Sequence, residues 1–220
     1  GAKHGTAVFA ISQTTGKGRQ GKQWFSPKGN LYLSILLTPQ NSIIQLPQLS
    51  FVAAVALGEI IEFLLPDTIL PQFKWPNDIL IQDKKCAGIL LESYTTPGKA
   101  IANWVTVGLG LNIMHHPKEI AGTTSLDAIG ADMLTITQLR DRVLESFQKW
   151  YGIWQEEGFK PIRDAWVKRA FRLNETIKVA INGEAIEGVF VDINNSGELL
   201  LSLPNGKKRL VSAGEVFFAE

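Results

Sequence analysis

Cysteine is almost absent from this sequence, because Cys86 is the only one among 220 residues. A single cysteine excludes an internal disulfide bond, and with no signal-peptide pattern present it favours a cytoplasmic protein. We find no long apolar span that predicts a membrane helix, and no repeats or low-complexity tracts. The net charge is only +1, so we do not expect the whole surface to bind nucleic acid or a membrane.

The hydrophobic content of 45% and the six tryptophans are enough for one sizeable core and a small second module. Periodicity predicts strands over residues 6–13, 31–37, 70–75, 79–82, 87–94 and 100–111, and helices over 47–65, 135–158 and 161–170. Short turns make the strands mostly antiparallel. We expect Phe63 to lie in the buried face of the first helix, Pro66 to end that helix, and Thr135 and Gln138 to form a capping box.

The pattern changes to short alternating strands in the last fifty residues. Predicted strands cover residues 177–179, 187–191, 199–201 and 209–211, and turns lie between them at 182–183, 194–197 and 204–206. Asn182-Gly183 is a strong hairpin pattern, because both residues tolerate the positive φ of a tight turn. We therefore expect a five-stranded SH3-like β-barrel over residues 173–220, beside a larger α+β unit over residues 1–172.

Residues 16–24, here called the glycine loop, alternate glycines with cations and end on Trp24. Glycine lets backbone amides approach an anion closely, Lys17, Arg19 and Lys22 can neutralise it, and the indole offers a stacking face. The loop lacks the Gly-Lys-Ser/Thr ending of a P-loop, so it is not one. It fits the dinucleotide fingerprint poorly, because it runs into a strand and no helix pattern follows it directly. Taken alone, it is equally compatible with a solvated basic hairpin loop.

Two further motifs follow, Lys74-Trp75-Pro76-Asn77-Asp78 with Lys85 and Gly88 shortly after it, and Gly108-Leu109-Gly110-Leu111-Asn112. In this order the three motifs resemble the biotin protein ligases, which join biotin to a lysine of a carboxylase carrier domain. The resemblance covers essentially the whole chain. It implies a mixed, mainly antiparallel sheet backed by helices, like the core of class II aminoacyl-tRNA synthetases.

The resemblance also implies the chemistry. Biotin carboxylate would attack the α-phosphate of MgATP to give biotinyl-5'-adenylate, and the carrier lysine would then take the biotinyl group. It assigns the biotin pocket to Gln13, Gly16, Lys17, Gly18, Arg19, Lys85 and Gly88, and contacts to ATP or the adenylate to Arg19, Trp24, Lys85 and Asn112. Arg19 and Lys85 are the leading expected catalytic residues, because cations stabilise charge that builds up on phosphorus. Lys74 and Asp78 are the other two, and they could orient the acceptor amine, the triphosphate or Mg²⁺. Mg²⁺ is expected to bind together with ATP, and we expect no metal site that is formed by protein ligands alone.

Several of these residues have a structural interpretation as well. Lys74 and Asp78 could simply form a salt bridge at a turn, and Trp75 and Cys86 are expected to be core residues. His115 and His116 lack a third ligand at useful spacing, so we expect no structural metal there. The family commonly has arginine at the positions of Lys17 and Lys22, and lysine replaces a bidentate phosphate contact with a single one.

The resemblance has gaps at the N-terminus. Family members usually carry a Ser/Thr-Asn segment before the strand at Thr6, and this sequence starts after it, so that part of the catalytic unit is expected to be missing. There is no N-terminal helix-turn-helix, which favours the monofunctional class and predicts no operator binding. The sequence does not give the oligomeric state, although free strand edges could pair in a homodimer or with the carrier.

Two alternative functions stay open. A lipoate ligase or octanoyl transferase would share the catalytic architecture, and a non-catalytic module could bind an anion in the glycine loop without turnover. The loop has few apolar anchors, so we expect it to be mobile without ligand and ordered by biotin or the adenylate.

Overall fold

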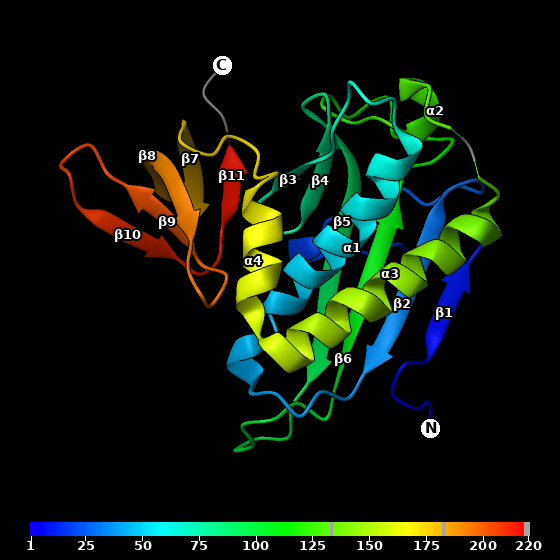
Figure 1. Cartoon of the computed structure of the whole chain (residues 1–220), viewed down its shortest axis with the longest axis horizontal. Coiled ribbons are helices and arrows are strands. Elements are labelled where there is room, and N and C mark those ends of the chain that lie inside the picture. Colours follow the sequence, from blue (N-terminus) through cyan, green and yellow to red (C-terminus); the bar gives the residue numbers. More distant parts are fainter. Residues whose placement is uncertain (133, 182–183, 218–220) are drawn as a thin grey trace.

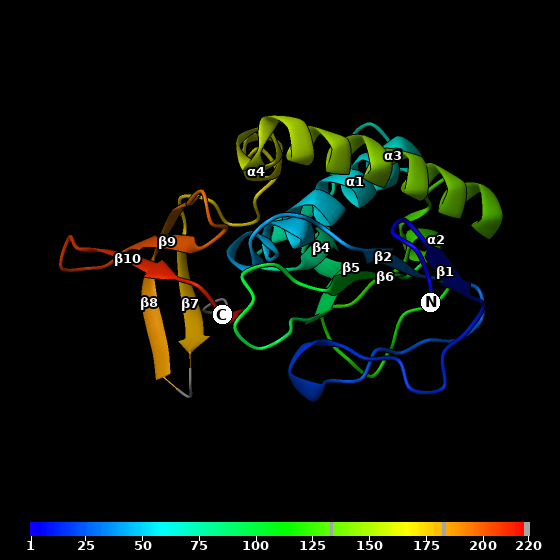
Figure 2. The same ribbon diagram turned by 90° about the horizontal axis from the view of Figure 1, so that it is seen from below.

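The computed structural model describes residues 1–132, 134–181 and 184–217 and contains two antiparallel sheets (Figure 1). The larger sheet has the strand order β1-β2-β6-β5-β4-β3. Its strands are β1 (Ala7–Ala10), β2 (Leu31–Leu37), β3 (Gln72–Lys74), β4 (Asp78–Ile81), β5 (Lys84–Tyr94) and β6 (Trp104–Leu111). Helices cover one face of this sheet, and the glycine loop lies below the other face (Figure 2). The second face is therefore the one available for a ligand.

Helix α1 (Gln48–Leu64) is the central core element. The segment Ile43–Leu64 is long and apolar enough to cross a membrane, which corrects our expectation of no such span. It is a core helix instead, because 72% of its most apolar window is buried inside the protein. The prediction for Phe63 was also wrong, since this side chain is 62% exposed, with the Arg142 guanidinium 4.9 Å from the centre of its ring. Apolar residues occur on nearly every face of α1, so the sequence pattern did not reveal which face of the helix stays exposed to solvent.

Helix α3 (Ile136–Glu157) packs across α1 on the covered face of the sheet. The predicted capping box is confirmed: Thr135 Oγ1 accepts from the Gln138 backbone, and the Gln138 side chain accepts from the Thr135 backbone. Gly158, at φ 80°, ends α3 and precedes α4 (Phe159–Val167). The remaining short helices are α2 (Leu126–Ile129), η1 (Arg19–Gly21) and η2 (Ile43–Gln45).

The C-terminal sheet has the order β10-β9-β8-β7-β11 and forms the predicted five-stranded unit. Its strands are β7 (Thr176–Ile181), β8 (Glu184–Ile193), β9 (Leu199–Ser202), β10 (Lys208–Val211) and β11 (Glu215–Phe217). The turn predicted at Asn182-Gly183 lies outside the described residues. Strand β11 pairs with β7 and was not singled out by the sequence pattern.

Two polar contacts, one buried and one partly buried, hold the C-terminal sheet against the larger unit. The Trp75 indole Nε1 donates to the Gly197 carbonyl at 3.0 Å, and Gln48 Nε2 donates to the Asn195 carbonyl at 2.9 Å. Trp75 is 3% exposed, which confirms that it is a core residue. These contacts hold the turn between β8 and β9 beside α1, and the same arrangement brings β11 to the open face of the larger sheet.

Candidate functional site

A cavity of about 810 Å³ lies between the open face of the larger sheet, the glycine loop and β11. Side chains alternate between the two faces of a strand, so every second residue of the central strands points into this space. The strand residues that line it include Ser34, Gly88, Leu90, Glu92, Thr106, Gly108 and Gly110. Gly214, Glu215 and Val216 add a wall from the C-terminal sheet.

Two glycines form the floor of the cavity, and the Trp24 indole packs directly against them. Gly88 on β5 and Gly110 on β6 are register partners. A Cβ atom at Gly110 would lie 2.6 Å from the indole Cε2 and Nε1, and one at Gly88 would lie 3.1 Å from Cζ3. The distance at Gly110 is too short for a side chain, so that position requires glycine while the indole lies there, and at Gly88 the indole would have to shift by a few tenths of an ångström. The buried Trp24 Nε1 has no hydrogen-bond partner within the described residues.

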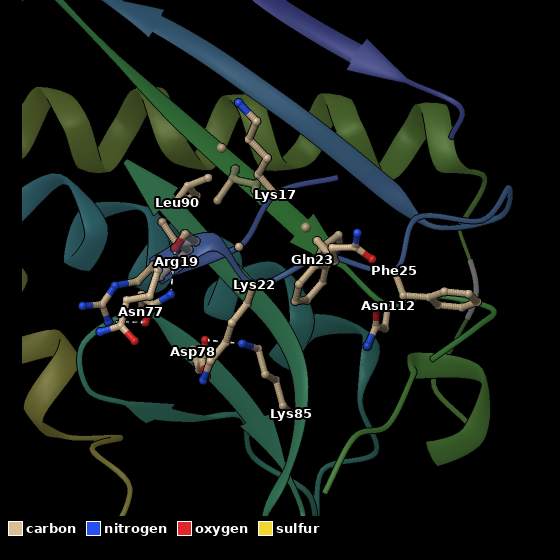
Figure 3. Close-up of a pocket in the computed structure, with 18 of the residues that line it drawn as sticks. Lys17, Arg19, Lys22, Gln23, Phe25, Asn77, Asp78, Lys85, Leu90 and Asn112 are labelled. Carbon is tan, nitrogen blue, oxygen red and sulfur yellow. Dashed lines mark hydrogen bonds and ion pairs between the residues drawn. The ribbon is translucent and has the colours of Figure 1, made fainter. Parts of the chain in front are cut away.

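Lys85 and Asp78 form an ion pair at the edge of the cavity, with 2.7 Å between Nζ and Oδ1 (Figure 3). Lys85 is the second residue of β5. Its backbone N–H donates to the Gly122 carbonyl, and its backbone carbonyl accepts from Thr124 N. Its ammonium lies 5.3 Å from the centre of the Trp24 ring. Lys74 on β3 is the register partner of Asp78 on β4. Strands β3 and β5 thus place one lysine each beside the Asp78 carboxylate of β4.

The electrostatics of this cluster are reflected in the pKa of Lys74. Desolvation by burial lowers that pKa below the ordinary lysine value, the nearby Asp78 carboxylate raises it in part, and the Lys85 ammonium lowers it further. A partly desolvated cation surrounded by other cations is well suited to an anionic ligand, because the ligand would relieve their mutual repulsion.

Arg19 reaches the cavity from the tip of the glycine loop. Its Nη1 donates to Asn77 Oδ1 at 3.0 Å, next to the Asp78–Lys85 pair (Figure 3). The tip is a tight turn in which Gln20 has a φ of 54° and Gly21 a φ of 74°. Gly18 N donates to the Lys22 carbonyl at 2.7 Å and closes this turn.

Gln13 and Gly16 form the base of the glycine loop. Ser26 Oγ donates to Gln13 Oε1 at 2.7 Å, and Trp24 N donates to the Gly16 carbonyl at 2.9 Å. A Cβ atom at Gly16 would lie 2.4 Å from Ser26 Oγ, so the base closes only around glycine. These contacts set the direction in which the Trp24 indole enters the cavity.

Lys17 and Asn112 also line the cavity. In Figure 3 the Lys17 ammonium points away from Asp78 and Lys85. Asn112 follows β6 directly, is 2% exposed, and donates from Nδ2 to the Thr124 carbonyl at 3.0 Å. Its buried amide therefore fixes the segment that follows β6 as well as facing the cavity.

Cys86 and the adjacent histidines lie outside this chemistry. Cys86 is fully buried, burial raises the pKa of its thiol, and its predicted role as a small apolar core residue is confirmed. His116 Nδ1 lies 3.1 Å from Thr123 Oγ1. Across residues 1–132, 134–181 and 184–217, no three His, Cys, Asp or Glu side chains are grouped for a metal ion.

The sequence analysis did not assign site roles to Asn77, Gly110 and Glu215. Two glycines separated by one residue in a buried strand indicate close approach of another group, and that pattern at Gly108 and Gly110 could have identified the floor. Asn77 stands inside a motif that had already been singled out. Glu215 carries no local pattern, because its ion pair with Lys22 joins residues 193 positions apart.

Comparisons with known proteins agree with this architecture. Residues 1–112 match the Biotin/lipoate A/B protein ligase family, and residues 173–219 match the Biotin protein ligase C terminal domain. A biotin–acetyl-CoA-carboxylase ligase of Paracoccus denitrificans is 36% identical over 218 residues, covering 96% of this chain and 89% of the relative. The bifunctional ligase/repressor BirA of Bacillus subtilis is 33% identical over 220 residues, covering 96% of this chain and 66% of the relative.

A solved structure extends the agreement to the fold. Biotin protein ligase from Aquifex aeolicus, in complex with biotin and ATP, has a TM-score of 0.84 and 28% identity, covering 99% of this chain and 90% of that one. The expected α+β fold class with a small, five-stranded C-terminal unit is therefore confirmed. By family match, sequence identity and fold, this chain belongs to the biotin protein ligase family.

Proposed function

We propose that this chain attaches biotin to a lysine of a biotin carboxyl carrier domain, using ATP and a biotinyl-5'-adenylate intermediate. The observation that carries the proposal is the convergence of Arg19, Lys85 and Asp78 on one cavity whose floor is a pair of glycines. The relatives described above bear names or bound ligands of the same chemistry.

In the first step, a carboxylate oxygen of biotin bonds to the α-phosphorus of ATP. The bond from that phosphorus to the bridging oxygen breaks, and pyrophosphate leaves. Two anions must approach each other, so fixed cations lower the barrier by offsetting their repulsion. We assign contact with both the carboxylate and the α-phosphate to Lys85, which is paired with Asp78, and contact with the phosphate to Arg19, which lines the same cavity.

Magnesium would arrive as part of MgATP. Such ions are usually held by one or two carboxylates together with substrate phosphates. Asp78 and Glu215 are cavity carboxylates that fit this donor set.

In the second step, the neutral amine of the carrier lysine attacks the acyl carbon. The bond from that carbon to the AMP oxygen breaks, AMP leaves, and the amine loses a proton. We assign the orientation of this amine to Lys74 and Asp78. Gln13, Gly16, Lys17, Gly18 and Gly88 are assigned to biotin, and Trp24 and Asn112 to the adenylate.

The proposal includes the organisation of the chain. Residues 1–172 form the catalytic unit, and residues 173–220 form an accessory unit that completes the cavity wall. The enzyme acts in the cytoplasm. Strand β1 pairs only with β2 among the described strands, so its outer edge is open to the carrier or to a second copy in a homodimer.

The decisive experiment is biotin-dependent exchange of labelled pyrophosphate into ATP with Mg²⁺, because it reports adenylation without a carrier. Lipoate is assayed in parallel as the alternative substrate. As a control, Lys84→Gln should exchange pyrophosphate like the unaltered protein, because Lys84 is exposed and lies outside the cavity lining. Exchange with biotin alone supports the proposal. Exchange with lipoate alone would identify a lipoate ligase, and no exchange with either acid would favour a binding module.

A further inference from the structure

Asn77 is held rigidly against β5. Its side-chain Nδ2 donates to the Ile89 backbone carbonyl at 2.9 Å, and its backbone carbonyl accepts from Ile89 N at 2.9 Å. With the amide nitrogen committed to a carbonyl, Oδ1 faces the glycine loop, where it accepts from Arg19 Nη1 at 3.0 Å. The reversed amide would set NH₂ against a guanidinium, so the two contacts together fix its orientation. Asn77 therefore presents a fixed acceptor to the loop.

The tip of the glycine loop has few other attachments. Within the loop, Gly18 N donates to the Lys22 carbonyl, and Lys22 N donates to the Arg19 carbonyl. Beyond the loop, the tip side chains form two polar contacts among the described residues: the Arg19–Asn77 hydrogen bond and the Lys22–Glu215 ion pair. The Lys22 side chain is 61% exposed, and the Arg19 contact is partly buried. A partly buried hydrogen bond from a charged donor restrains a loop more strongly than an exposed ion pair.

The chemistry of the acceptor matters as much as its position. An asparagine oxygen is a neutral acceptor for the guanidinium, so the positive charge and the other N–H groups stay available for phosphate. A carboxylate in the same place would pair with the guanidinium and cancel its charge. Neighbouring residues on one hairpin thus hold the two cations differently, Asn77 with Arg19 and Asp78 with Lys85.

We infer that Asn77 is a positioning residue that docks Arg19 and keeps the glycine loop closed over the cavity without neutralising the cation. For catalysis the inference rests on the proposed function, since the docked Arg19 would then retain the adenylate. The docking itself is a property of the ligand-free protein. Asn77 would act through Arg19 and not by touching the substrate.

Hydrogen exchange of peptide 16–24 in the ligand-free protein tests the docking. Asn77→Ala should raise the exchange rate of the Gly18 and Lys22 amides about tenfold, because one hydrogen bond to a charged group is lost. Arg19→Ala removes the same bond from the loop side, without touching Ile89, and should have the same effect. Asn103→Ala is the matched control, because Asn103 also accepts from a turn, at Thr96, away from the cavity lining. Unchanged exchange in both Asn77→Ala and Arg19→Ala would overturn the inference.

Kinetics separate docking from charge. Arg19→Gln keeps an N–H donor for Asn77 but loses the cation, so the loop should stay protected while pyrophosphate exchange falls about a hundredfold. Asn77→Ala keeps the cation and should release more free adenylate per transferred biotin, by about fivefold, with a raised KM for ATP. In the Arg19→Ala background, Asn77→Ala should add no further release. Added release in that background would show a role independent of Arg19 and would overturn the inference.

The two proposals fail separately. If the unaltered protein exchanges no pyrophosphate with biotin, the proposed function is wrong, and the hydrogen-exchange comparison still decides whether Asn77 docks Arg19. If pyrophosphate exchange is normal in the unaltered protein and neither Asn77→Ala nor Arg19→Ala changes the hydrogen exchange of the loop, the ligase function stands and the docking role is rejected.

Discussion

Lys22 in the glycine loop and Glu215 on β11 form an ion pair, with 2.5 Å between Nζ and Oε1. The C-terminal sheet thus contacts the loop directly as well as forming a wall of the cavity. The hydrogen bond from Lys22 is the main cause that lowers the pKa of the Glu215 carboxyl below its ordinary value of 4.5. The pair is therefore complete above that pH and is lost as the pH falls through the lowered pKa.

Reversing the charge of Glu215 should open the loop without unfolding the protein. Glu215→Lys places two ammonium groups together, so we expect faster hydrogen exchange in peptide 16–24 and a higher KM for ATP. The free energy of unfolding should change by less than ~1 kcal/mol, because exposed ion pairs contribute little. The swap Lys22→Glu with Glu215→Lys should restore loop protection. Equal protection in the single variant and the unaltered protein would contradict a role for this pair.

Gly110→Ala should displace the Trp24 indole from the cavity floor. The added methyl group would lie 2.6 Å from indole atoms, and the strand backbone cannot yield to make room. We expect a red shift of Trp24 fluorescence and at least about tenfold slower pyrophosphate exchange, equivalent to ~1.4 kcal/mol.

Gly152→Ala is the matched control for Gly110→Ala, because a Cβ at Gly152 on α3 meets nothing within 4 Å. The assay compares each variant with and without Trp24→Phe, so that the fluorescence change is assigned to one indole. An unshifted fluorescence spectrum together with normal pyrophosphate exchange in Gly110→Ala would show that the Trp24 indole does not pack against Gly110.

The sequence predicted the elements well where the information is local. The capping box of Thr135 and Gln138 lies within one helical turn, and it is present as expected. The glycine loop, the Lys74–Asp78 motif and the Gly108–Asn112 motif are each contiguous, and the sheet order brings all three to one cavity.

Long-range contacts were beyond the sequence for physical reasons. The Arg19–Asn77 bond joins residues 58 positions apart, and it depends on how the glycine loop folds back over the sheet. The seat of Trp24 on Gly110 depends on the register of β5 and β6, which no single strand specifies. Phe63 shows the same limit in a helix, because its exposure depends on where α3 lies and not on the apolar pattern of α1.

Lys74 should make the stability of the protein depend on alkaline pH. An unfolded lysine keeps its proton up to about pH 10.4, whereas burial lowers the pKa of native Lys74. Between these two values the unfolded state binds more protons, so stability rises with pH. Lys74→Met lacks this contribution, and Lys84→Met, at an exposed lysine, is the control. Denaturant unfolding from pH 7 to 10.5 should therefore show the unaltered protein gaining stability relative to Lys74→Met, and parallel curves would contradict the desolvation of Lys74.

Cys86 should be inert in the native protein. Its side chain is fully buried, its Sγ donates to the Asn112 carbonyl at 3.4 Å, and burial raises the pKa of the thiol, so little thiolate forms. An aromatic disulfide reagent should modify it only as fast as the protein unfolds. Cys86→Ala should leave pyrophosphate exchange within about twofold of the unaltered protein and destabilise it by ~1 kcal/mol. Rapid modification under native conditions would show that β5 opens locally.

Lys85→Gln should cause the largest loss of adenylation among single lysine changes. Its ammonium is held by Asp78 at 2.7 Å and lies 5.3 Å from the centre of the Trp24 ring, where carboxylate and phosphate would meet. Removing a fixed charge aimed at a developing anion costs about 2.7–4 kcal/mol, or roughly 10²–10³ in rate. Lys85→Arg keeps the charge but spreads it over a planar fork, so it should recover only part of the rate. Lys84→Gln removes the adjacent, exposed lysine and should stay within about twofold, which separates loss of the aimed charge from a change in net charge. Equal losses in Lys84→Gln and Lys85→Gln would mean that the general positive field, and not the position of Lys85, supports the reaction.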